Sequence, residues 1–147
     1  MHRFQSPLLK IHSVCEQQRR LAEIELARVL NLQRQAEQQV HEATTAVEVA
    51  QTAISQAMRT RISSSMLLGI QGHLVHAKEK LEVARTQVHE AASKVKVARE
   101  AFQKIQTQVD GLSRQLDRQR ADYRKEVFKE QQGVMDDGSV FRWTGSN

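Results

Sequence analysis

Histidine is the residue type in this chain that could most readily bind a metal. His73 and His76 are three residues apart, so a helix would place both imidazoles on one face. A protein zinc site takes at least three side-chain ligands, and no third ligand lies within reach of this pair. We therefore predict no metal site and no bound cofactor.

The single cysteine is the other candidate for chemistry. A nucleophilic thiol needs an activating base held beside it, and the surroundings of Cys15 supply none at a recognisable spacing. We interpret Cys15 as a small residue of the seam between helices, in a reduced protein. His12 falls where a helix would face a partner helix, and a polar residue at such a position more often fixes the register.

No motif of an enzyme active site is present. The sequence has no glycine-rich phosphate loop, no Gly-x-Ser-x-Gly elbow and no pair of carboxylates expected in an enclosed pocket. The chain is predicted not to be an enzyme.

The composition indicates an elongated helical protein. Only 39% of the 147 residues are hydrophobic and 4% are aromatic, which is little material for a globular core. The sole proline is Pro7, so nothing interrupts a helix over most of the length. No apolar run approaches the roughly 20 residues that cross a bilayer, and we expect a soluble, cytoplasmic protein.

The formal net charge of +5 favours acidic partner surfaces. The basic residues alternate with acidic ones, as where Arg118 and Arg120 lie between Asp117 and Asp122. Without an unbroken basic stripe or interleaved aromatic residues, we do not expect nucleic-acid binding.

Apolar residues recur every three and four positions in two long arms, which is the pattern of a coiled coil. The first arm places at its a and d positions Ala22, Leu26, Val29, Gln33, Ala36, Val40, Ala43, Val47, Ala50, Ile54 and Ala57. The second arm places there Leu74, Ala77, Leu81, Ala84, Val88, Ala91, Val95, Ala98, Phe102, Ile105, Val109, Leu112, Leu116 and Tyr123.

A serine- and glycine-containing segment between the arms breaks this pattern and predicts a turn. The predicted fold is all-α, a single long antiparallel two-helix coiled coil, or αα-hairpin. Its expected parts are a first arm over about 8–62, a turn over about 63–72, a second arm over about 73–132 and a flexible tail over 133–147.

Side-chain volumes favour this hairpin over a parallel dimer. In an antiparallel pair each bulky a residue faces an alanine at d, so the helix axes can lie evenly close. A parallel dimer would alternate crowded and hollow layers. We therefore expect a monomer. A turn centred near Ser65 would bring Ala50 to Leu81, and one centred near Gly69, which we favour weakly, would bring Ala50 to Val88 and Gln33 to Ile105.

Two places look suited to partners. The turn carries more apolar residues than the seam between the helices can take up, and exposed apolar tips often bind; these residues are Met66, Leu67, Leu68 and Ile70. The opposite end of the hairpin gathers basic residues from both ends of the chain: Arg3, Arg19, Arg20, Arg118, Arg120, Arg124 and Lys125.

Three segments resemble the FliJ family of bacterial flagellar protein export. The first is FQSPLLKI from Phe4 to Ile11, a phenylalanine and a leucine pair leading into a long helix. The second is EIELAR from Glu23 to Arg28, and the third is YRKEVFKEQQGVMDD from Tyr123 to Asp137. Length and two-arm design match that family over nearly the whole chain.

The resemblance implies a cytoplasmic component of the flagellar type III export apparatus, at the cytoplasmic face of the inner membrane when assembled. In the family the paired termini enter a hexameric export ATPase as a stalk, the hairpin reaches toward the membrane protein of the export gate, and export chaperones are escorted. The basic end would then contact the ATPase, and the apolar tip would contact the gate. The alternative is a generic coiled-coil spacer or adaptor that does not regulate an ATPase.

Overall fold

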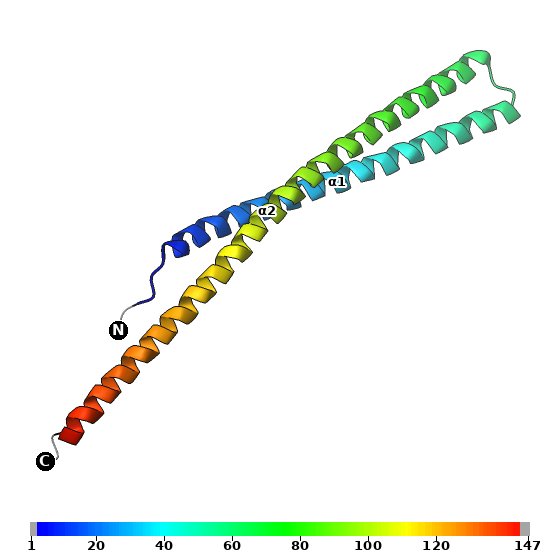
Figure 1. The fold of residues 1–147 in the computed structure, drawn as a ribbon. Coiled ribbons are helices and arrows are strands. Elements are labelled where there is room, and N and C mark those ends of the chain that lie inside the picture. Colours follow the sequence, from blue (N-terminus) through cyan, green and yellow to red (C-terminus); the bar gives the residue numbers. More distant parts are fainter. Residues whose placement is uncertain (1–2, 145–147) are drawn as a thin grey trace. The chain divides into compact units, whose positions relative to one another are not determined.

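The computed structural model describes residues 3–144, and the side chains of residues 3–138. Two long helices make up most of this part of the chain. Helix α1 spans Pro7–Arg59 and helix α2 spans Ser64–Thr144 (Figure 1). No strand occurs within the described residues. The chain forms two compact units, which we call the terminal unit (Met1–Arg20 with Lys104–Asn147) and the loop unit (Leu21–Gln103).

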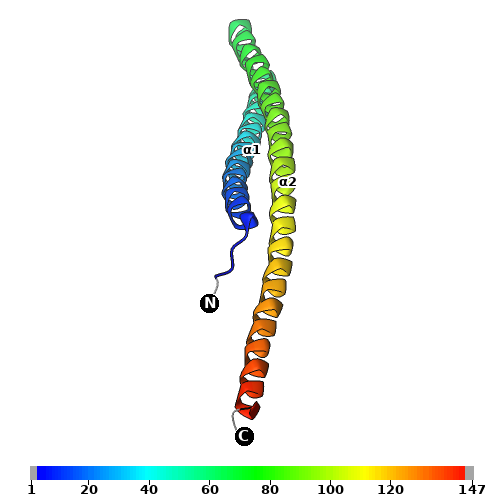
Figure 2. The ribbon, with the colours of Figure 1, turned by 60° about the vertical axis from the view of Figure 1, so that its left-hand side comes forward.

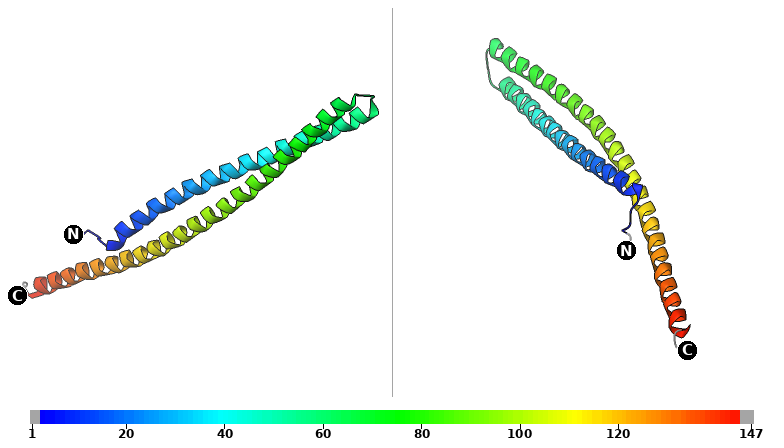
Figure 3. Two further views of the ribbon diagram at one scale, coloured as in Figure 1. Left: turned by 90° about the horizontal axis from the view of Figure 1, so that it is seen from above. Right: turned by 90° about the vertical axis from the view of Figure 1, so that its left-hand side faces the viewer.

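In the loop unit the two helices run side by side in opposite directions from a short connection (Figures 1 and 3). Figure 3 shows this connection joining the end of α1 to the start of α2 in both of its views. The predicted fold, an all-α antiparallel hairpin, is confirmed.

The buried residues follow the predicted heptads. Every buried hydrophobic residue among those described lies at an a or d position named above, from Val29, with 3% of its surface exposed, to Leu116, also with 3%. No polar or charged residue of the described chain is buried. Burial of this one stripe is the main source of stability, because isolated helices gain little from propensity alone.

Alanines face bulky side chains across the seam of the loop unit. One cluster joins Val47 of α1 to Ala77 and Leu81 of α2. A second joins Val29 to Val95 and Ala98. The small alanine side chains leave room for the larger residue of the opposite helix, as the volume argument predicts.

The register differs from both alternatives that the sequence suggested. Val47 clusters with Ala77 and Leu81, and Val29 clusters with Val95 and Ala98. The midpoints of these pairs in the sequence fall between Ile62 and Ser64, so the hairpin centres there. The preferred glycine-centred turn, with Ala50 at Val88 and Gln33 at Ile105, is therefore wrong.

Serine rather than glycine sets this turn. The backbone N–H of Met66 donates to the Ser63 hydroxyl at 3.3 Å, and the N–H of Leu67 donates to the Ser63 carbonyl at 3.1 Å. Ser63 thus caps α2, which is a strong start signal for a helix. Gly69 and Gly72 lie inside α2 without a positive φ, so neither supplies the left-handed residue of a turn.

The helices begin and end at other residues than those predicted from the sequence. The connection covers 60–63 instead of 63–72, and α1 ends at Arg59 instead of near 62. The structure also continues α2 to Thr144, where a tail from 133 was expected. Gly133 and Gly138 each cost a helix only about 1 kcal/mol, and no proline follows them. Residues 145–147 of the expected tail lie outside the described residues.

In the terminal unit α2 extends well past its last contacts with the N-terminal segment. Figure 2 shows this C-terminal part, coloured orange to red, as an unbroken helical ribbon. Every described side chain from Phe128 to Gly138 is exposed. Among them, Val134 and Met135 expose 72% and 74% of their surface.

Enlarging a seam alanine should destabilise the hairpin. Ala84→Leu inserts three carbon atoms where only 6% of the residue is exposed, so we expect a loss of about 1–3 kcal/mol in the free energy of unfolding. Ala92→Leu is the matched control because Ala92 is exposed on the same helix, and it should change stability by less than about 0.5 kcal/mol. Urea unfolding followed by circular dichroism measures both, and equal losses would contradict the seam.

Disulfide cross-linking should report the register. In a Cys15→Ala background, Val47→Cys with Ala77→Cys should oxidise readily, because facing seam residues lie within the roughly 7 Å between Cα atoms that a disulfide requires. Val47→Cys with Ala91→Cys tests the glycine-centred turn. Moving 14 residues along α2 displaces the second thiol by about 21 Å, so this pair should stay reduced, and its preferential oxidation would overturn the register.

Candidate partner-binding surfaces

A short extended segment before α1 ties the N-terminus to α2 in the terminal unit. The Ser6 hydroxyl accepts the N–H of Leu8 at 3.2 Å, and the Ser6 carbonyl accepts the N–H of Leu9 at 3.1 Å. Ser6 therefore caps α1 next to Pro7, which suits the first helical position. The same hydroxyl donates to the Gln119 side-chain oxygen at 2.5 Å.

Aromatic packing strengthens this attachment. The rings of Phe4 and Tyr123 lie 5.5 Å apart between centroids at an angle of 58°. The guanidinium carbon of Arg120 lies 5.9 Å from the centre of the Phe4 ring, within the range of a cation–π contact. The sequence placed Tyr123 on the seam, but it gave no signal that Phe4 and Arg120 would meet there.

His12 makes a polar contact within the seam of the terminal unit. One of its ring nitrogens, Nε2, lies 2.9 Å from the Ser113 hydroxyl, and both residues are half-buried. The contact matches the prediction that a polar seam residue fixes register, because one specific pairing satisfies both side chains.

The predicted basic residues all belong to the terminal unit, and most of them face solvent. Those that are exposed are Arg3, Arg20, Arg118, Arg120, Arg124 and Lys125. Arg19 differs, because it is half-buried and its Nε donates to a Glu16 carboxylate oxygen at 3.0 Å. Arg19 is thus the member of the set least available to an outside partner.

Ion pairs along the loop unit belong to solvated helix faces. Arg28 donates hydrogen bonds of 2.9 and 2.7 Å to the two Glu25 carboxylate oxygens, and this contact holds the pKa of Glu25 below its ordinary value. The same contact raises the pKa of Arg28. The contribution to stability is therefore present at neutral pH and lost as pH falls through the lowered pKa. Both side chains are exposed, so the pair is weak.

The predicted apolar tip splits into two pairs. Leu67 and Ile70 are half-buried on the side of α2 that faces α1. Met66 and Leu68 expose 61% and 67% of their surface. The second pair is the more exposed one, although Met66 also lines a groove with Val49 and Ala50 of α1. Met58, in the last turn of α1, exposes 70% of its surface.

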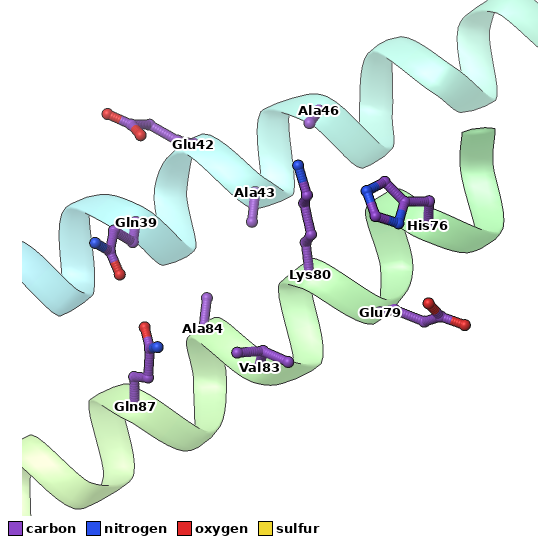
Figure 4. A pocket seen from close by; sticks show the side chains of 10 residues that line it. All are labelled: Gln39, Glu42, Ala43, Ala46, His76, Glu79, Lys80, Val83, Ala84 and Gln87. Carbon is purple, nitrogen blue, oxygen red and sulfur yellow. The ribbon is translucent and has the colours of Figure 1, made fainter.

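A groove of about 540 Å³ runs between the helices in the middle of the loop unit. Its lining residues, shown in Figure 4, are Gln39, Glu42, Ala43, Ala46, His76, Glu79, Lys80, Val83, Ala84 and Gln87. Lys80 reaches from α2 toward α1, whereas Glu42 and Glu79 point outward. The lining combines small apolar side chains with amide and charged groups.

Neither a metal-binding cluster nor a membrane-spanning helix occurs within the described residues. In the described part of the chain, no three side chains of histidine, cysteine or acidic residues gather closely enough to hold a metal ion. His73 and His76 are both exposed. No helix within residues 3–144 is sufficiently long and apolar to span a bilayer.

These features define a two-helix coiled-coil protein. The model of the family described as "Flagellar FliJ protein" matches residues 4–147, and the chain belongs to that family. It is therefore a component of the flagellar protein export apparatus, in a family of structural or escort proteins and not of enzymes. The comparisons found no match among curated proteins or solved structures.

Removing the Phe4 ring should loosen the terminal unit. Phe4→Ala deletes both the aromatic pair and the cation–π contact, so we expect a loss of about 1–2 kcal/mol in local stability. Hydrogen exchange of amides around Tyr123 measures this loss. Gln5→Ala is the control, because Gln5 is exposed beside Phe4 and should leave exchange unchanged. Equal protection in both variants would contradict a role for the ring.

Proposed function

We propose that this protein is the stalk of the hexameric flagellar export ATPase and inserts its paired termini into that ring. The attachment of the N-terminal segment to α2 in the terminal unit carries the proposal. Phe4 packs on Tyr123, and Ser6 is hydrogen-bonded to Gln119, so the N-terminal segment is held against α2. Helix α2 continues beyond this contact to Thr144. An N-terminal segment tied to α2 in this way can enter an opening as one body.

The exposed charges of the terminal unit support the same role. Arg118, Arg120 and Arg124 follow one another at short spacing on α2, and all three are exposed. Such side chains accelerate association with an acidic surface, and they contribute more to the rate of encounter than to final affinity. An acidic collar at the entrance of the ring is the complementary surface.

The remaining roles concern the rest of the molecule. We assign the tip, with Met66, Leu67, Leu68 and Ile70, to contact with the membrane protein of the export gate. Escort of export chaperones would use the sides of the loop unit, where the groove shown in Figure 4 is suited to contact. In this role the protein works in the cytoplasm, at the inner face of the membrane.

Charge reversal in the terminal unit tests the ATPase contact. Arg118→Glu with Arg124→Glu leaves the Phe4–Arg120 contact in place, and the triple variant adds Arg120→Glu. We expect stimulation of the export ATPase to fall about tenfold or more at low salt, because steering by charge is lost. Circular dichroism checks that helicity is retained.

The matched control makes the same change of charge elsewhere. Lys94→Glu with Lys96→Glu reverses two exposed charges of the loop unit and should leave stimulation intact. A generic spacer predicts that no charge reversal matters. Unchanged stimulation by the folded Arg118→Glu, Arg124→Glu variant would therefore reject the stalk contact.

A further inference from the structure

Exposed apolar and basic side chains lie on both sides of the connection between the helices. We define the tip patch as Met58, Arg59, Arg61, Met66 and Leu68, all of which are exposed and belong to the loop unit. The three apolar members expose between 61% and 70% of their surface. They come from the last turn of α1 and the first turns of α2, on both sides of a connection of four residues.

Acidic residues are missing from this end of the hairpin. Between Glu48 and Glu79 the sequence contains neither aspartate nor glutamate, although 17 acidic residues occur in the 147 of the chain. Within the described residues, Arg59 and Arg61 form no ion pair, whereas Arg28 and Arg85 each pair with a glutamate on their own helix. The positive charge of the patch is therefore available to an outside anion.

The neighbours of the two arginines define the kind of partner. Ser63, Ser64 and Ser65 form the rim of the connection and are exposed, so the patch combines projecting apolar side chains with hydroxyl groups and guanidinium groups. Met and Leu side chains that project from a tight turn can enter the boundary between headgroups and acyl chains. Arginines beside them hold anionic headgroups.

We propose that the tip patch docks on an anionic lipid surface. The complementarity of charge selects this occupant: guanidinium groups without acidic neighbours match a layer of phosphates and carboxylates, and three separate apolar side chains need no shaped pocket to be buried in lipid. The inference goes beyond the proposed function: a tip that contacts the membrane protein of the gate would also rest on the lipid around that protein. It is independent of the contact between the termini and the ATPase.

The energetic contributions set the size of the expected effects. A basic residue close to an anionic leaflet strengthens binding about fivefold, and the attraction decays within about 10 Å at moderate salt. Two charge reversals should therefore weaken binding at least about twentyfold. Loss of exposed apolar side chains should weaken it separately, because their burial does not depend on salt.

Sedimentation with vesicles tests the proposal on the full chain. We expect binding to vesicles of phosphatidylcholine containing phosphatidylserine and little binding to phosphatidylcholine alone. Arg59→Glu with Arg61→Glu should abolish the preference for phosphatidylserine. Met66→Ser with Leu68→Ser should weaken binding at both low and high salt.

Matched variants elsewhere in the loop unit separate the patch from the general positive charge of the protein. Arg34→Glu with Arg99→Glu and Val83→Ser with Val97→Ser change exposed residues of the same types and should bind as the unchanged protein does. Equal weakening by tip and control variants would overturn the proposal. Binding of the tip patch to an immobilised acidic peptide, without binding to the vesicles, would also overturn the proposal and would indicate a protein partner.

Discussion

The close approach of two helices across a seam of alanines and larger aliphatic residues is the interaction on which the structure depends. Within the described residues, every buried side chain belongs to this one stripe. Valine or leucine of one helix fills the space that alanine leaves on the other, so the seam can be narrow without hollow layers. Loss of that complementarity would remove most of the energy that keeps the helices folded.

The heptads were readable from sequence because burial in a coiled coil repeats with a fixed period. Val29, Leu81 and Leu116 are buried where the pattern predicts. The register was not readable, since glycine and serine are both plausible in a turn. In the structure Ser63 caps α2 next to the turn, whereas Gly69 and Gly72 lie inside the helix. Composition alone does not tell whether a turn forms at a serine that caps the next helix or at a flexible glycine.

The candidate surfaces were partly predictable for a related reason. Exposed arginines and an apolar tip follow from position relative to the seam, which the heptads fix. Contacts outside that periodic pattern do not follow from position relative to the seam. The packing of Phe4 on Tyr123, with Arg120 nearby, is such a contact. Leu67 and Ile70 also turned toward α1, because the true connection lies a few residues earlier than expected. Family membership was indicated by short terminal segments and by the two-arm design, and the family comparison confirmed it.

The C-terminal part of α2 leaves its apolar side chains exposed to solvent. From Phe128 to Gly138 no described side chain is covered, although Phe128, Val134 and Met135 are large and apolar. A solitary helix of this kind is only marginally stable in water, so part of the chain's population should unwind there. A binding partner that covers these side chains would also have to hold the segment helical. The measured affinity would then include the entropic cost of ordering this helical segment. Substitutions that change helix propensity would therefore change the affinity, even at residues that do not contact the partner.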